Sequence, residues 1–271
     1  MGSVRLALVF VLLVSAPVRG LNAQQAANEP AGEFWLTYSV FAIGLTVAQA
    51  DIIFNLADGT YNGLLDIQTV GLANTLASWS FRAESAGRRE AGALVPNEHI
   101  TRIVRRDRAR QIEIFFEPGG PERIVADPPI RPRADRTPLT DDMLPGTIDL
   151  VTAILSMFQV NGEAAPCLAP MPVFDGRHRF DLVMEPIASR RFAGRFFFSG
   201  LARGCRIRVE PIGGFKSGDD NFNFNRSYQT WFADVTGTGA QAIVFMEADF
   251  KFGHATIALT QVRNFEGQPL R

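Results

Sequence analysis

The feature that most constrains the fold is a long succession of short apolar runs broken by turn-forming residues. From Phe34 onward, runs rich in Val, Ile, Phe and Thr alternate with Gly, Asp and Asn. Asp58-Gly59 and Asp175-Gly176 are typical of hairpin turns. The pattern predicts antiparallel strands over residues 36–41, 45–55, 61–70, 79–84, 99–105, 111–117, 172–174, 178–185, 205–210, 228–234, 242–252 and 254–263. Residues 71–78 fit either a short helix or a bulged edge strand.

Alternation within two of these segments indicates which side chains face the core. In 178–185, His178 shares a face with three apolar residues, and most residues of the other face are charged. In 205–210, Cys205 shares a face with Ile207 and Val209. Because successive strand residues point to opposite faces, Cys205 is expected on the buried side of its strand.

The middle of the chain differs from the strand pattern. Residues 127–138 contain four prolines and three arginines, which predicts a surface loop without ladder hydrogen bonds. Residues 147–158 then show apolar side chains at helical spacing, with Thr147 as N-cap and Asp149 in the first turn. We expect one amphipathic helix of about twelve residues here, ended by Gly162.

Together these elements predict a mainly β protein with a single β-rich domain at 34–267. The expected architecture is a large curved antiparallel sheet of about ten to twelve strands, forming an open or incomplete β-barrel. We expect the helix to cover an opening or to pack inside the curve. A sheet of this size leaves exposed edges unless it wraps onto itself or onto a helix.

The first 23 residues are typical of a signal peptide. Arg5 precedes a short apolar run, and small residues lead to a cleavage site before Gln24. This pattern predicts export, with 24–33 as a flexible N-terminus. No later stretch reaches membrane-spanning length, so no transmembrane segment is expected in the mature chain. The formal net charge of −1 gives no long-range attraction for nucleic acid or an anionic membrane.

The chain has only two cysteines, Cys167 and Cys205. An oxidising compartment would allow them to form a disulfide. That bond would close a loop of about 39 residues and stabilise the fold by about 4 kcal/mol in the chain-entropy model. Pairing explains both cysteines better than thiolate chemistry does.

One segment carries a family resemblance. Residues 172–182 read PVFDGRHRFDL and resemble the PVFDGRRRYDL signature of DUF3108, an uncharacterised family of proteobacterial envelope proteins. The motif positions are Phe174, Asp175, Gly176, Arg177, Arg179 and Asp181. Further similar segments are Tyr38-Ser39-Val40 with Gly44, Asp127-Pro128-Pro129, the helix at 147–155, and Pro211 to Phe215.

The resemblance covers most of the mature chain and implies a periplasmic β-rich protein with its cysteines at the family's paired positions. It implies no settled activity. His178 and Phe180 depart from the signature, where Arg and Tyr are more usual. The missing tyrosine hydroxyl at Phe180 argues against a catalytic role there.

Two clusters have residue types that bind metals. Asp175, His178 and Asp181 could act as metal ligands or as an acid–base pair. Strand geometry favours a structural interpretation, with a turn Asp, a half-buried His and an exposed Asp paired with an Arg. The oxygen-rich loop at 219–225 has a spacing that suits calcium, but it lacks the glycine and glutamate of a calcium loop. His99 and His254 lie in unrelated segments, so we expect no metal site and no cofactor.

Arginines are dense around residues 102–110 and could clamp phosphate or carboxylate groups. The candidates for ligand contact are Arg105 and Arg106. The alternative is a solvated strand pair around a turn near Asp107, kept soluble by charge. Nearby arginines in the same hypothesis are Arg88, Arg89, Arg102, Arg108, Arg110, Arg131, Arg133 and Arg136.

Phenylalanine is abundant and points to buried rings. The residues expected to line a core or cavity are Phe192, Phe196, Phe198, Phe245, Phe250 and Phe252. No nucleophile motif or phosphate-binding glycine loop is present. We therefore expect a non-enzymatic periplasmic protein that supports the cell envelope by binding a lipid-like ligand or an envelope protein. The alternatives are a hydrolase or metal-dependent enzyme acting on cell-wall or polysaccharide substrates, and a purely structural scaffold. The sequence does not indicate an oligomeric state.

Overall fold

The computed structural model of the chain describes residues 33–56, 59–131, 133–158, 167, 169–194, 196, 198–216, 227–237, 240–250 and 253–264. The predicted signal peptide at 1–23, the segment 24–32, Gly162 and the candidate calcium loop at 219–225 lie outside these residues. Among the described residues, no helix combines the length and the apolar character that a membrane crossing requires.

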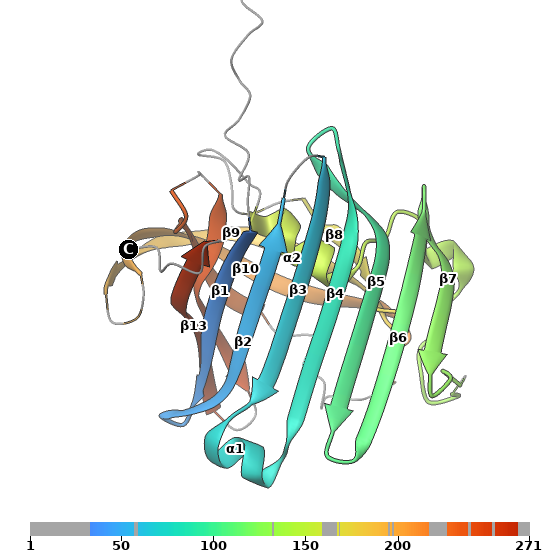
Figure 1. The fold of residues 1–271 in the computed structure, drawn as a ribbon, viewed down its shortest axis with the longest axis horizontal. Coiled ribbons are helices and arrows are strands. Elements are labelled where there is room, and N and C mark those ends of the chain that lie inside the picture. Colours follow the sequence, from blue (N-terminus) through green and yellow to red (C-terminus); the bar gives the residue numbers. More distant parts are fainter. Residues whose placement is uncertain are drawn as a thin grey trace, which may run out of the picture.

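Thirteen strands form one antiparallel sheet (Figure 1). They are β1 (Glu33–Ala42), β2 (Leu45–Asn55), β3 (Thr60–Thr69), β4 (Trp79–Glu90), β5 (Ala93–Arg105), β6 (Arg108–Glu117), β7 (Gly120–Asp127), β8 (Met171–Phe174), β9 (Arg179–Ala193), β10 (Ser199–Gly213), β11 (Ser227–Asp234), β12 (Gln241–Phe250) and β13 (Gly253–Asn264). Their order is β7-β6-β5-β4-β3-β2-β1-β13-β12-β11-β10-β9-β8. Because β7 and β8 do not pair with each other, the sheet stays open, as predicted.

The sheet consists of two meanders joined where β1 pairs with β13, with Trp35 opposite Arg263. It has one strand more than the expected upper number, because β7 was not predicted. Most β7 residues are exposed on both faces, so the strand shows no apolar alternation. Strand β4 also runs past the expected end at Glu84 to Glu90, through a segment of small and charged residues.

The main helix begins later than predicted. Helix α2 spans Leu150–Phe158, and Asp149 caps it, because Asp149 Oδ1 accepts the backbone N–H of Thr152 at 2.9 Å. The expected N-cap, Thr147, instead donates its hydroxyl to Leu144 O at 2.8 Å. Of the two structures that fit residues 71–78, the short helix is the observed one, as α1 (Gly71–Leu76).

Helix α2 packs inside the curve of the sheet. It contacts β3, β4, β5, β8 and β12 and lies between the β1–β6 face and β8–β10 in Figure 1. Val151, Leu155 and Phe158 are buried. Gly63 of β3 allows this close approach, because a Cβ there would lie 2.6 Å from Leu155 Cδ1. The apolar face of the helix therefore fills the concave side of the sheet.

The β8–β9 turn seals the open side of the sheet against β6 through side chains. Phe174 at the end of β8 packs with Ile112, Ile114 and Phe116 of β6. At Gly176 in the turn, φ is +86° and a Cβ would lie only 2.4 Å from Ile112 Cγ2. The loop between β7 and α2 adds backbone bonds on the same side, from Gly146 N to Gly119 O and from Ile148 N to Pro172 O.

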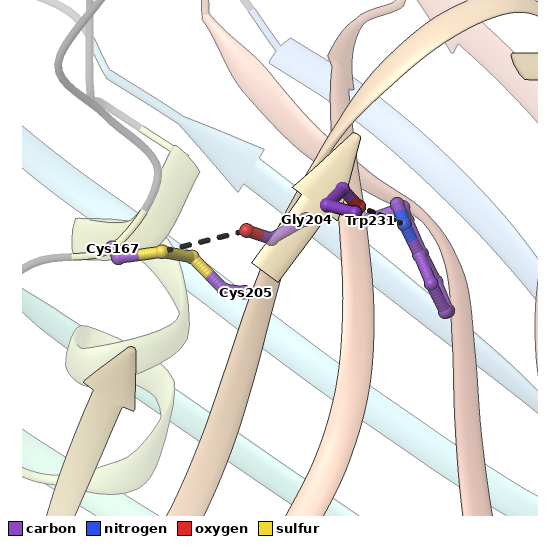
Figure 2. Close-up of a disulfide and its surroundings, with 5 residues drawn as sticks. Cys167, Gly204, Cys205 and Trp231 are labelled. Atoms are coloured by element: carbon purple, nitrogen blue, oxygen red, sulfur yellow. Dashed lines mark hydrogen bonds between the residues drawn. A yellow bond between two sulfur atoms is a disulfide. The ribbon is translucent and has the colours of Figure 1, made fainter. Parts of the chain in front are cut away.

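The predicted disulfide is present (Figure 2). It joins Cys167, which follows α2, to the fully buried Cys205 of β10, with the two Cα atoms 5.7 Å apart. Next to it, Trp231 Nε1 of β11 donates to Ala188 O of β9 at 3.2 Å. A Cβ at Gly204, on the intervening strand, would lie 2.6 Å from that oxygen. Cys205 and Trp231 both belong to the main core.

Gly176→Ala should lower the free energy of unfolding by about 1–3 kcal/mol more than Gly92→Ala does, because a Cβ at Gly176 overlaps Ile112. Gly92 is a matched control, since its φ is +87° and nothing lies within 4 Å of a Cβ there. Urea unfolding of both variants measures the difference. Equal losses would contradict the close packing of the turn on β6.

The Cys167→Ala/Cys205→Ala double variant should lose about 4 kcal/mol of unfolding free energy, because the disulfide restricts the unfolded chain. The two cysteines are 38 residues apart. Guanidinium unfolding with and without reductant measures the loss. Reductant should move the midpoint of the wild type and leave the midpoint of the double variant unchanged. If titration of the denatured wild type without reductant finds two free thiols, the prediction is wrong.

Candidate functional site

An aromatic pocket lies where β9 and β10 are connected. Its volume is about 200 Å³. The residues that line it are Arg190, Arg191, Phe192, Ala193, Phe196, Phe198, Val244 and Phe245. The structure thus brings together four of the six phenylalanines expected to line a core or cavity. The side chain of Phe250 and the whole of Phe252 lie outside the described part of the chain.

The rings of the pocket pack against one another and against the core. The centroids of Phe192 and Phe245 are 5.3 Å apart, and those of Phe196 and Phe245 are 5.9 Å apart. Phe41 of β1 lies 5.4 Å from Phe196, and Trp231 lies 6.1 Å from Phe245. Such spacings are typical of stabilising aromatic pairs. The pocket wall is therefore held by strands from several parts of the sheet.

A cation lies over these rings. The guanidinium carbon of Arg190 is 5.1 Å from the centroid of Phe192, 5.1 Å from that of Trp231 and 5.3 Å from that of Phe245. These distances suit cation–π attraction. Arg190 Nη1 also lies 2.8 Å from Glu247 Oε1 of β12. Glu247 thus fixes the Arg190 guanidinium above an apolar wall and offsets part of its charge.

A larger groove of about 300 Å³ lies over β2–β5. Its cation, Arg82, is already paired with Asp66 at 3.2 Å and Glu84 at 2.7 Å. The groove also contains Glu33 and Glu98, and it has no cluster of aromatic rings for an apolar ligand to contact. The aromatic pocket is therefore the better candidate for a ligand, although it is the smaller of the two.

Arg105 and Arg106 do not join the pocket. They lie at the β5–β6 turn, both are exposed, and Arg106 N donates to Ser78 O at 3.2 Å. Arg105 pairs with Arg108 across the hairpin. This placement matches the solvated strand pair that the sequence left as the alternative.

The metal-binding hypothesis for residues 175–181 is only partly matched by the geometry. Asp175 Oδ2 lies 2.9 Å from His178 Nδ1, so these two meet; strand geometry argued only against placing Asp181 on the same face as His178. They meet because the turn folds back, with Asp175 Oδ1 accepting the backbone N–H groups of Arg177 and His178. Asp181 points elsewhere and pairs with Arg179 at 2.6 Å. Among the described residues, no group of three or more His, Cys, Asp or Glu side chains could hold a metal.

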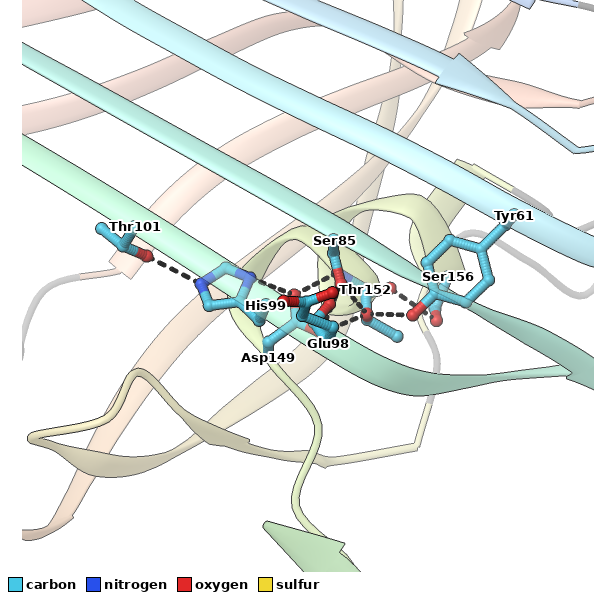
Figure 3. A network of polar contacts seen from close by, with 8 residues as sticks. All are labelled: Tyr61, Ser85, Glu98, His99, Thr101, Asp149, Thr152 and Ser156. Atoms are coloured by element: carbon cyan, nitrogen blue, oxygen red, sulfur yellow. Dashed lines mark hydrogen bonds and ion pairs between the residues drawn. The ribbon is translucent and has the colours of Figure 1, made fainter. Parts of the chain in front are cut away.

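A buried polar network that the sequence did not reveal lies under α2 (Figure 3). Its centre is Asp149, whose Oδ1 lies 3.0 Å from His99 Nδ1 and whose Oδ2 accepts a hydrogen bond from Ser85 Oγ at 2.8 Å. Thr152 Oγ1 also donates to Asp149 Oδ2 and lies 2.6 Å from the hydroxyl of Tyr61. The network thus links the start of α2 to β3, β4 and β5.

Part of this network has the atom order of a hydrolase triad. Thr101 Oγ1 lies 2.8 Å from His99 Nε2, and the other ring nitrogen faces Asp149. However, Thr101 is 5% exposed, His99 1% and Asp149 0%. A substrate cannot reach these atoms, so their arrangement serves to hold the helix on the sheet.

Burial alone would raise the pKa of the Asp149 carboxyl. The charge of His99 and hydrogen bonds from His99 and Thr152 outweigh burial, so this pKa lies below its usual range. Burial, reinforced by the negative charge of Asp149, raises the pKa of the Tyr61 phenol. At neutral pH the network therefore holds an ionised carboxylate and a neutral phenol away from water.

The sequence contained a weak signal of this network. Ser85 pairs with His99 across β4 and β5, and Gly63 pairs with Ser85 across β3 and β4. All three face the core in a row beneath α2. A polar side chain at an inward position of an otherwise apolar strand face is unusual, and it needs a buried hydrogen-bond partner.

Asp149→Asn should lower the free energy of unfolding at pH 7 by about 3–5 kcal/mol, because it removes a buried carboxylate that accepts hydrogen bonds from Ser85 and Thr152 and hydrogen bonds to charged groups are each worth about 1.5–3 kcal/mol. Because the folded-state pKa of Asp149 is depressed, its contribution is present above its unfolded pKa of about 3.9 and is lost as pH falls through the folded value. The variant should therefore lose less stability on acidification than the wild type. Urea unfolding between pH 7 and pH 3 measures both effects.

Asp66→Asn is the matched control for Asp149→Asn. Asp66 is a carboxylate with its own hydrogen-bonding partner, Arg82, but both side chains are partly exposed. The Asp66→Asn variant should lose no more than about 1 kcal/mol of unfolding free energy. Equal losses of unfolding free energy in the two variants would show that burial does not determine how much Asp149 contributes to stability.

Comparison with known proteins gives a family but no activity. The family described as "Protein of unknown function (DUF3108)" matches residues 34–260. A solved structure from Brucella abortus, described as a β-barrel-like protein of domain of unknown function DUF1849, is similar at a TM-score of 0.45 and 8% identity, over 87% of this chain and 99% of that chain. No curated protein matches the sequence. Because the family match spans most of the chain, this protein belongs to the DUF3108 family.

Proposed function

We propose that this protein is a non-enzymatic periplasmic protein that supports the cell envelope by binding an anionic, lipid-like ligand in the aromatic pocket. The observation that carries the proposal is the position of Arg190 above the phenylalanine-lined wall. An apolar chain gains free energy by contact with the rings, and the guanidinium favours a negative headgroup at the rim.

The size of the pocket limits what enters it. Its volume of about 200 Å³ lies below the range of about 300–1,000 Å³ that is usual for sites enclosing a drug-sized molecule. The pocket therefore suits the end of an acyl chain, with the remainder of the ligand lying across the rim. Arg191, which is exposed beside Arg190, adds a second positive charge there.

Two features support a periplasmic location. The predicted signal peptide at 1–23 would direct export, and the Cys167–Cys205 disulfide is typical of an oxidising compartment. The non-enzymatic role is supported by the burial of the Thr101–His99–Asp149 set, which has a catalytic atom order but no path for a substrate.

A structural scaffold is the second candidate, and one observation favours it. The side chains of α2 fill the concave side of the sheet, with Val151, Leu155 and Phe158 all 1% exposed or less. The interior is thus solid beneath the helix, and ligand binding is confined to the aromatic pocket. Failure of the pocket to bind any amphiphile would leave the scaffold as the better proposal.

Dodecanoate should bind to the delipidated protein and quench or shift the fluorescence of Trp231, which packs against Phe245 of the pocket wall. Phe196→Ala should weaken binding by about 10-fold, because removal of a half-buried ring costs about 1.5 kcal/mol or more. Arg190→Gln should weaken binding of dodecanoate but not of neutral dodecanol. Calorimetric titration measures all of these affinities.

Phe81→Ala is the matched control, since Phe81 is also half-buried but stacks on Trp79 in β4, away from the pocket. It should leave dodecanoate binding unchanged. Absence of binding to the wild type, or equal binding to Phe196→Ala, argues against ligand carriage. Mass spectrometry of protein refolded with cell-envelope extract provides a second readout, in which a clean blank has the same meaning.

A further inference from the structure

Three arginines from separate segments converge at the β8–β9 turn. Arg110 lies near the start of β6, Arg136 lies in the loop between β7 and α2, and Arg177 lies in the turn itself. None of them belongs to the aromatic pocket, which lies at the other end of β9. This cluster is separate from the ligand site proposed above and does not depend on it.

Backbone packing brings the three segments together. Gly176 packs against Ile112, two residues beyond Arg110 on the same face of β6. Arg136 Nη1 lies 3.2 Å from His178 Nε2 and donates to Gly214 O at 2.6 Å. An isolated bridge between Arg136 and Lys216 fixes the backbone of the loop beside this turn.

The hydrogen-bonding capacity of these guanidinium groups is largely unused by the protein. Among the described residues, the Arg177 guanidinium makes no hydrogen bond. Arg110 donates only to Pro128 O, at 2.7 Å. Arg136 Nε is buried and has no partner within the described part of the chain. Buried donors without acceptors cost free energy, so an acceptor supplied from outside would stabilise this arrangement.

The local charge is positive and poorly compensated. Partial burial lowers the pKa of Arg177, and so do the charges of Arg136 and Arg110. The carboxylate of Asp175 opposes them, but it already accepts hydrogen bonds from its own turn and faces His178. Arg133, which also repels Arg177, has its own partner in Asp135 at 2.9 Å. Arg110, Arg136 and Arg177 thus keep a net positive charge that the described carboxylates around them do not neutralise.

We infer that Arg110, Arg136 and Arg177 form a binding site for a phosphate group at the β8–β9 turn. A phosphate carries about −1.5 to −2 charges at pH 7 and three strong acceptor oxygens, which suits cations that approach from three segments. Guanidinium groups bind such oxygens with paired, directed donors. The phosphate group could belong to a free ion or to a phospholipid headgroup.

Inorganic phosphate is the first probe. It should bind the wild-type protein in calorimetric titration at constant ionic strength, set with sodium chloride. Arg177→Gln should weaken phosphate binding by about 10- to 100-fold, since a hydrogen bond to a charged group is worth about 1.5–3 kcal/mol. Arg110→Gln should weaken it in the same direction. Both variants should fold, because these side chains make few bonds within the protein.

Arg102→Gln is the matched control, because Arg102 is exposed on β5 and pairs with Gln111, so it lies on the opposite face of the sheet from Arg110 and Ile112. It should leave phosphate affinity unchanged. An unchanged affinity in Arg177→Gln would overturn the inference, and so would a loss that appears instead in the Arg105→Gln/Arg106→Gln pair.

Vesicles of phosphatidylglycerol and of phosphatidylcholine distinguish the two sources. Both lipids carry a phosphate, but only phosphatidylglycerol carries a net negative charge. Sedimentation with phosphatidylglycerol that is competed by inorganic phosphate supports a headgroup ligand, whereas binding of inorganic phosphate alone supports a free ion. No binding of either probe would overturn the site. Dodecanoate affinity should be unchanged in Arg177→Gln, so this inference and the proposed function can fail separately.

Discussion

The buried carboxylate of Asp149 is the interaction on which the rest of the fold depends. A charge removed from water costs several kcal/mol unless it is paired and hydrogen-bonded. Asp149 finds its partners only when α2, β4 and β5 are all in place, because they supply Thr152, Ser85 and His99. A one-residue slip of β4 or β5 would turn Ser85 or His99 to the outer face. The network thus couples the position of the helix to the register of the sheet.

An open sheet of this size must protect its concave side without closing its hydrogen-bond ladder. Here α2 fills the interior, and Phe174 with Ile112 and Ile114 seals the side where β8 meets β6. The disulfide then ties the segment after the helix to β10. Because these contacts occupy the middle of the molecule, little space for a ligand is left beneath α2. The two sites that we propose instead lie where strands end and loops begin.

The sequence predicted the parts of this structure that have a strong local pattern. The limits of β2 were predicted to the residue, since its alternation is regular, and the disulfide was predicted from the two cysteines of a chain with a signal-peptide pattern. Strand β7 was missed because neither of its faces is largely buried. The network around Asp149 was missed for another reason: its members lie far apart in the chain, and only the register between strands brings them together. The four pocket phenylalanines were named from residue type, and so were Arg110 and Arg136 as phosphate candidates, whereas Arg177 joins them only through the fold.

The arginine cluster lies at one end of β9 and the aromatic pocket at the other. The distance between them determines whether one ligand could bind at both. Arg177 precedes the strand and Phe192 lies near its end, 15 residues later. At about 3.3 Å per residue, the strand between them is about 50 Å long. A membrane lipid spans half of a bilayer, about 20 Å. β9 runs behind the β1–β6 face in Figure 1, and its length along the chain is more than twice the span of one lipid. We therefore expect the anionic group proposed at Arg190 and the phosphate inferred at Arg177 to belong to different molecules.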